Sequence, residues 1–175
     1  MENTKNKFPK HLQVFFKELS DYLDTQLLFY GSIQRSDYFP GQSDIDVDIF
    51  TDNEQAIIAK LQHFLHVNKN EFKKTVWVMN DVSGYGYKLK YENNIKQINV
   101  EFSIYNEKFR EPMLEQHITK TMLPLYINII LYILKFSYYK LCIVPEGIYI
   151  YIKKFLLNDA IGRGNDLFVI TGDLN

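Results

Sequence analysis

Two aspartates stand out as residues whose type and spacing could do chemistry. Asp44 and Asp46 begin an apolar run, DIDVDIF, that extends to residue 50. Side chains alternate between the two faces of a β-strand, so a strand here would place both carboxylates on one face. Two carboxylates on one face repel each other and destabilise the fold unless a cation lies between them. A hard divalent ion such as Mg²⁺ prefers oxygen ligands and is commonly shared with substrate phosphates.

A glycine–serine pair supplies the second half of a candidate site. Gly31 and Ser32 follow the apolar run at residues 27–30, and eleven residues separate Ser32 from Asp44. Glycine lets a backbone approach a ligand closely, and free N–H groups at a turn that enters a helix bind phosphate. A phosphate-binding turn beside a metal-binding aspartate pair is the combination that nucleotidyl transfer requires.

Residues 30–46 resemble the signature of the nucleotidyltransferase superfamily of the DNA polymerase beta type. That signature is a hydrophobic residue, Gly, then Gly or Ser, a short spacer, and Asp-x-Asp or Asp-x-Glu on a strand; here it is YGS at 30–32 and DID at 44–46. The spacer is similar to that of small stand-alone members, although Ser36 stands where glycine is more usual. The resemblance implies an α+β fold with a mixed β-sheet and flanking helices.

The resemblance also implies which residues contact a nucleotide. Gly31 and Ser32 would position the β- and γ-phosphates, and the spacer residues Arg35 and Ser43 would bind nucleotide as well. For Arg35 a second interpretation carries equal weight, an ion pair with Asp37 two residues along the chain. Asp37 itself is expected to lie in a loop or at the end of a helix.

A third carboxylate is implied on a later strand, and the sequence offers one candidate. Residues 96–105 alternate between apolar and polar types, and Glu101 is the only carboxylate among them. The resemblance implies two Mg²⁺ ions, with Mn²⁺ as the alternative, held by Asp44, Asp46 and Glu101. One of these carboxylates could also accept the proton of the attacking hydroxyl. Asp48 lies on the same strand face as the aspartate pair, but the family pattern ends at Asp46, so we expect a structural role for it.

A lysine in the apolar C-terminal part completes the expected site. The segment ILKFSYYK at residues 133–140 resembles a helix of poly(A)-polymerase-type members, in which the lysine contacts the nucleotide triphosphate. We therefore expect Lys135 to bind nucleotide. The alternative is a side chain that extends along apolar surface to reach water.

Composition excludes several other classes of protein. The chain has 175 residues, of which 46% are hydrophobic, and a formal net charge of −1. Nothing here indicates a sequence-independent nucleic-acid binder, which would need a basic surface. The single cysteine excludes an internal disulfide. The apolar stretch at residues 122–144 is interrupted by polar residues, which favours a buried helix over a membrane span. The polar N-terminus shows no signal peptide, so we expect a cytoplasmic protein.

Hydrophobic periodicity predicts the order of elements. Helices are expected at residues 8–24, 53–66, 107–122, 123–143 and 146–158, and strands at 27–30, 44–50, 72–79, 85–91 and 96–105. Residues 1–105 would form the catalytic core. Residues 106–175 would form a helical half that closes over the cleft and ends in a tail after residue 159.

The sequence therefore predicts a metal-dependent nucleotidyltransferase. It would move an NMP, AMP being the expected one, from an NTP to a hydroxyl of a small molecule or a protein and release pyrophosphate. A chain of 175 residues leaves no room for a separate RNA-binding domain, so a nucleic-acid acceptor is not indicated. Two alternatives stay open: a binding module of a toxin–antitoxin pair that keeps the fold for a protein interface, and a template-independent RNA-terminal nucleotidyltransferase.

Overall fold

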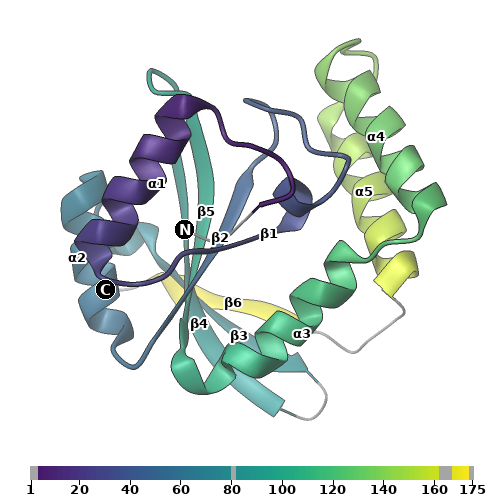
Figure 1. The fold of residues 1–175 in the computed structure, drawn as a ribbon. Coiled ribbons are helices and arrows are strands. Elements are labelled where there is room, and N and C mark those ends of the chain that lie inside the picture. The colour runs from purple at the N-terminus through teal and green to yellow at the C-terminus, as the bar shows by residue number, and fades with distance from the viewer. Residues whose placement is uncertain (1–3, 80–81, 162–166, 174–175) are drawn as a thin grey trace.

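The structure is a computed structural model that describes the backbone of residues 4–79, 82–161 and 167–173. Side chains are described for residues 4–77, 83–118 and 121–157. The described chain is an α+β protein, with a mixed β-sheet flanked by helices (Figure 1). Within the expected tail after residue 159, residues 162–166 lie outside the described residues.

The sheet has six strands in the order β1-β2-β5-β4-β3-β6. Their bounds are β1 Leu28–Tyr30, β2 Ile45–Thr51, β3 Lys73–Met79, β4 Val82–Asn93, β5 Ile98–Asn106 and β6 Leu167–Asp173. β2 and β5 pair in parallel, and the other neighbouring strands pair antiparallel. The two strands that carry the expected carboxylates are therefore direct neighbours.

Helices cover the two faces of the sheet differently. α1 (Lys10–Leu23) and α2 (Glu54–Leu65) lie on one face, where their apolar sides meet Ile45, Val47 and Ile49 of β2 in the larger core. α3 (Arg110–Thr121) lies across the other face and packs Met113 into a smaller core that includes Trp77 (Figure 1). The smaller core fills only part of its face, and the carboxylates lie beyond it.

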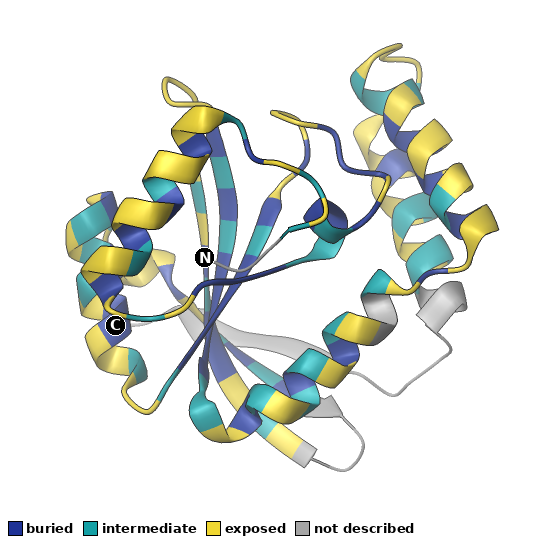
Figure 2. Ribbon diagram, viewed as in Figure 1, coloured by how far each residue is buried: buried dark blue, intermediate teal, exposed yellow. Residues whose placement is uncertain are grey.

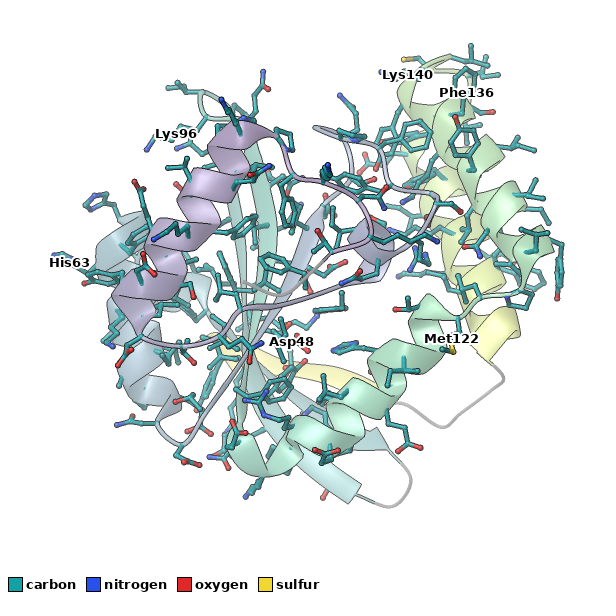
Figure 3. The ribbon with its side chains drawn as sticks, in the orientation of Figure 1. Asp48, His63, Lys96, Met122, Phe136 and Lys140 are labelled. Atoms are coloured by element: carbon teal, nitrogen blue, oxygen red, sulfur yellow. The ribbon has the colours of Figure 1, made fainter. Side chains whose placement is uncertain are left out.

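α4 (Leu125–Tyr139) and α5 (Glu146–Ile161) pack against each other at one end of the molecule. The sequence predicts a buried helix here, and that prediction is wrong for half of α4. Its inner side is buried at Ile127, Leu131, Leu134 and Lys135. Its outer side is exposed (Figure 2), and Phe136 lies on that side (Figure 3). None of the helices in the described ranges is long and apolar enough to cross a membrane.

The C-terminal segment differs from the expected tail. Residues 167–173 form β6, which pairs antiparallel with β3 and so extends the sheet at its edge. The elements on either side of residue 105 are thus joined through the sheet as well as through the connecting chain. The division into a core at 1–105 and a helical half at 106–175 stays a prediction.

Candidate active site

The sheet places the expected carboxylates close together. Asp46 of β2 is the direct partner of Glu101 on β5, so both side chains leave the same face of the parallel pair. Asp44 lies immediately before β2, where its Oδ1 accepts a hydrogen bond of 2.7 Å from Nδ2 of Asn99. The alternation read from the sequence thus corresponds to the strand register in the structure.

The Gly31–Ser32 pair begins a short 3₁₀ helix, Gly31–Gln34, directly after β1. Gly31 has a φ of 71°, in the left-handed region, and a Cβ atom there would collide with Oδ2 of Asp46. A glycine is therefore required both by the turn and by the approach of the aspartate. The carboxylate of Asp46 thus lies directly beside the backbone of the Gly31 turn.

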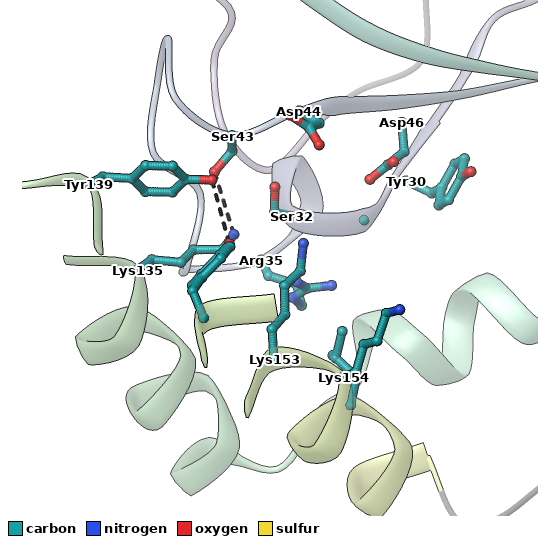
Figure 4. A pocket seen from close by; sticks show the side chains of 13 residues that line it. Tyr30, Ser32, Arg35, Ser43, Asp44, Asp46, Lys135, Tyr139, Lys153 and Lys154 are labelled. Carbon is teal, nitrogen blue, oxygen red and sulfur yellow. Dashed lines mark hydrogen bonds between the residues drawn. The ribbon is translucent and has the colours of Figure 1, made fainter. Parts of the chain in front are cut away.

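A pocket of ≈ 310 Å³ opens between these strands and the α4–α5 pair (Figure 4). Its volume is at the lower end of the range for small-molecule sites. It is lined by Tyr30, Gly31, Ser32, Arg35, Ser43, Asp44, Asp46, Lys135, Tyr139, Tyr149, Lys153, Lys154 and Leu157. Seven of the eight expected site residues line this pocket. The eighth, Glu101, lies beside it on the strand next to Asp46.

The negative charge of the Asp46 carboxylate is only partly balanced by nearby cations. Burial and the neighbouring Glu101 carboxylate raise the pKa of Asp46 to about 7, although the charges of Lys153 and Lys88 act in the opposite direction. A further contribution that raises this pKa comes from Asp44. A cation beside these oxygens would relieve the repulsion, so the donor set fits a hard divalent ion.

The described side chains do not form a three-ligand cation site. Across the ranges that the structure describes, no three His, Cys, Asp or Glu side chains lie together in a way that could hold an ion. Two of the expected ligands have partners within the protein: Glu101 forms an ion pair with Lys88, and Asp44 accepts the hydrogen bond from Asn99. Asp44 and Asp46 thus fit the expected role directly, and Glu101 does so once its carboxylate leaves Lys88.

Asp37 lies in a turn after the 3₁₀ helix, as expected, but sequence analysis did not predict its burial. It is fully buried, and Arg35 donates two hydrogen bonds to its carboxylate, of 2.8 and 3.1 Å. Nζ of Lys135 lies 2.9 Å from Oδ2 of Asp37 and 3.4 Å from Oγ of Ser43. Burial by itself would raise the pKa of Asp37, but the hydrogen bond from Arg35 and the two cations lower it overall.

This cluster bears on two alternatives that the sequence left open. Arg35 pairs with Asp37, and Lys135 is 2% exposed, so the alternative in which Lys135 extends to bulk water is wrong. Burial lowers the pKa of Lys135, against the opposing effect of Asp37. Both cations still line the pocket beside Ser32 (Figure 4), so contact with a nucleotide remains a prediction for each.

Asp48 has a different environment although it shares the strand face. It is fully buried, and Nε2 of His117 on α3 donates a hydrogen bond to its carboxylate. The His117 ring stacks on Tyr30 with a centroid separation of 3.9 Å. Asp48 therefore lies between the sheet and α3 (Figure 3), where it ties the helix to β2.

Two lysines of α5 also belong to the pocket but were not expected. Lys153 and Lys154 extend from α5 toward the Gly31 turn and the aspartates (Figure 4). Their sequence signal is an adjacent pair of charges in an otherwise apolar helix, since such charges need water or a counter-charge. The pocket therefore has carboxylates on its strand side and ammonium groups on its helix side.

Comparison with known families agrees with this arrangement. A family model described as a nucleotidyltransferase domain matches residues 12–125, more than half of the chain. The chain belongs to the nucleotidyltransferase domain family. The match covers the Gly31 turn and the strands that carry Asp46 and Glu101. The α4 and α5 lysines lie outside the matched residues.

Two solved structures are similar at low identity. The crystal structure of the Cid1 poly(U) polymerase matches with 13% identity and a TM-score of 0.41, covering 74% of this chain and 40% of that one. The structure of the GLD-2/RNP-8 complex matches with 9% identity and a TM-score of 0.41, covering 87% of this chain and 57% of that one. The chain thus spans less than two thirds of either. A search of curated proteins found no match.

Proposed function

We propose that this nucleotidyltransferase is a metal-dependent enzyme that transfers an NMP from an NTP to an acceptor hydroxyl and releases pyrophosphate. The observation that carries the proposal is the division of charge in the pocket. Asp44 and Asp46 line one side, and Lys135, Lys153 and Lys154 line the other. A nucleoside triphosphate with its metal ions needs both kinds of surface at once.

The carboxylates would hold the metal ions. Asp44, Asp46 and Glu101 supply the oxygen ligands that Mg²⁺ or Mn²⁺ prefers, and the ions would activate the hydroxyl and neutralise the leaving pyrophosphate. The residues of the chain would do the rest by positioning. One of the three carboxylates could accept the hydroxyl proton as the new bond to phosphorus forms.

The turn and the lysines would bind the triphosphate. Backbone N–H groups of the 3₁₀ helix that starts at Gly31 begin next to the aspartates, as a phosphate cradle requires. Lys153 and Lys154 would face the terminal phosphates from α5, and Lys135 would hold Ser43 in place from α4. Such preorganised charges contribute to catalysis mainly by orientation and electrostatics.

The high pKa of Asp46 favours an enzyme over a binding module. A fold kept only as a protein interface gains nothing from a carboxylate whose pKa is raised to about 7 by burial and by Glu101. An asparagine would be more stable there. Residues that destabilise a fold locally are typical of functional sites.

The acceptor is proposed as a hydroxyl of a small molecule or a protein, and the nucleotide as ATP. The formal net charge of −1 gives a nucleic-acid acceptor no general electrostatic attraction. An RNA 3′ end is the second candidate, and the assay below includes it.

Radiolabel transfer tests the proposal. The protein is incubated with each α-³²P-labelled NTP, with Mg²⁺ or Mn²⁺, and with separate small-molecule, protein and RNA fractions of a cell lysate. We expect label from ATP to appear in one fraction, and no label with the D44A/D46A double variant. Absence of transfer from every NTP, together with no NTP–Mg²⁺ binding by calorimetry, would overturn the proposed function.

A further inference from the structure

Lys88 occupies an unusual position for a lysine on a sheet. It lies on β4, whose residues pair antiparallel with those of β5, and its direct partner there is Ser103. Partner residues share a face, so Lys88 lies on the same face as Glu101 and, through the next strand, Asp46. Lys88 therefore reaches the carboxylates from the neighbouring strand β4, whereas Lys153 and Lys154 reach the pocket from α5.

The neighbouring Lys90 provides an internal comparison. Lys90 is the direct register partner of Glu101, yet its Nζ pairs with Glu92, at 2.7 Å. Lys88 instead reaches diagonally to Oε1 of Glu101. The Lys88–Glu101 pair is 30% and 33% exposed, whereas the Lys90–Glu92 pair is 59% and 52% exposed. Lys88 is therefore the less solvated of the two lysines, and it faces the site.

The charge of Lys88 acts on both carboxylates. It forms the ion pair with Glu101, and it also opposes the rise in the pKa of Asp46 that burial and Glu101 cause. Without Lys88, two neighbouring carboxylates would face each other with less compensation. With Lys88, one oxygen of Glu101 is already occupied by an ion pair.

We propose that Lys88 is a built-in counter-ion of the third carboxylate, which a divalent cation must displace before Asp46 and Glu101 can share it. This inference rests on the proposed function. The protein would then bind a free cation weakly and bind it well only with a nucleotide, whose phosphates add ligands and negative charge. Lys88 is thus a positioning residue that couples cation binding to nucleotide binding.

Cation binding to the full chain without nucleotide tests this directly. Free Mn²⁺ is titrated into wild type, K88M and K90M, and bound metal is followed by electron paramagnetic resonance and by calorimetry. Removing a positive charge next to the site should tighten Mn²⁺ binding by about tenfold in K88M. K90M should tighten Mn²⁺ binding clearly less than K88M, because Lys90 forms its ion pair with Glu92 and is more exposed, although its charge also acts on Asp44 and Glu101.

Two further variants separate the charge of Lys88 from its packing. K88R keeps a positive charge and should retain the weak binding of wild type. The double variant K88M/E101Q should lose the gain, since the released ligand is then absent. Thermal unfolding in EDTA provides a second readout: K88M should melt at a lower temperature than K90M, because its loss leaves Glu101 unpaired beside Asp46.

The outcomes distinguish this inference from the proposed function. Equal Mn²⁺ affinity in K88M and wild type, with label transfer intact in wild type, would refute the role of Lys88 alone. If Mn²⁺ binds to none of the variants, with or without NTP, both the counter-ion and the metal-dependent function are wrong. If K88M does not fold, K88Q replaces it, because glutamine also removes the positive charge at position 88; K88Q should show the same tighter Mn²⁺ binding, and equal affinity in K88Q and wild type would refute the role of Lys88.

Discussion

Two aspartates beside the same pocket have opposite electrostatic environments. Asp37 is fully buried between two cations, Arg35 and Lys135, and these lower its pKa although burial by itself would raise it. Asp46 is half-buried next to another carboxylate, and burial and Glu101 raise its pKa to about 7. One site is compensated from within the protein, and the other is not.

The difference indicates which part of the pocket is structural and which awaits a ligand. The Asp37 cluster ties α4 to the spacer loop, because Nζ of Lys135 also donates a 2.9 Å hydrogen bond to the backbone oxygen of Asp37. It therefore fixes the helix side of the pocket without any ligand. On the Asp46 side, the charges of Lys88 and Lys153 offset the burial and the neighbouring carboxylates only in part, so a bound cation would supply the rest. One side of the pocket is therefore held by the Asp37 cluster, and the other carries a carboxylate charge that the protein does not fully balance. This arrangement suits the binding of a metal ion together with the phosphates of a nucleotide.

The largest expected effect is the loss of catalysis when the Asp46 carboxylate is removed. D46N should reduce label transfer by about 10³-fold or more, because it removes a metal ligand at the reacting phosphate. In EDTA the variant should unfold at an equal or higher temperature than wild type, since it removes a repulsive charge. The two measurements are made on one preparation. Substantial label transfer by D46N would contradict the catalytic role of Asp46 and with it the contrast to the structural role of Asp37.

Removing the charge of Asp37 should have the opposite effect on stability. D37N leaves two buried cations without their counter-charge, so we expect a loss of about 3 kcal/mol in the free energy of unfolding, measured with denaturant. D21N is the matched control, because Asp21 pairs with Lys17 on an exposed helix surface and should change stability by less than about 1 kcal/mol. Similar losses in D37N and D21N would contradict the structural role of Asp37.

The pH dependence of stability should also have opposite signs at the two positions. The pKa of Asp46 is raised from 3.8 to about 7, so the native state binds more protons than the unfolded state in this interval. Its contribution to metal-free stability is therefore lost as pH rises from 3.8 to about 7. The advantage of D46N over wild type should grow over that range, to on the order of 4 kcal/mol.

For Asp37 the sign reverses because its native pKa is lowered. Its stabilising contribution is present above the ordinary aspartate pKa and is lost as pH falls through the lower native value. The deficit of D37N should therefore be largest near neutral pH and shrink on acidification. Denaturant titrations in EDTA at several pH values test both variants; parallel curves for D37N and D46N would contradict the comparison.

These two aspartates also show what the sequence could predict. The shared strand face of Asp46 and Glu101 was predictable because a period of two assigns a face to each strand residue, and the strand of Glu101 holds a single carboxylate. The strands and the helices α1 and α2 followed from periodicity, whereas the third carboxylate and the α+β fold were implied by the family resemblance. Local patterns of this kind are encoded within a few neighbouring residues.

The rest depends on partners that are distant in the sequence. The hydrogen bond from Lys135 to Asp37 joins residues 98 positions apart, and nothing near Asp37 indicates it. The pairing of Lys88 with Glu101 instead of Glu92 depends on side-chain reach across two strands. β6 was missed because its apolar run is short and lies near glycines, so only pairing with β3 defines it as a strand.

The smallest expected effect concerns Lys153, whose charge acts on both sides of the comparison. It opposes the rise in the pKa of Asp46, and it contributes to lowering the pKa of Lys135. Because its proposed contact is with the phosphates of bound NTP, K153Q should raise KM for NTP by about three- to tenfold and change kcat less, a loss of uniform binding. K140Q is the control, since Lys140 is exposed at the end of α4 (Figure 3) and does not line the pocket. Steady-state kinetics separate the two parameters, and an unchanged KM in K153Q would place the triphosphate away from α5.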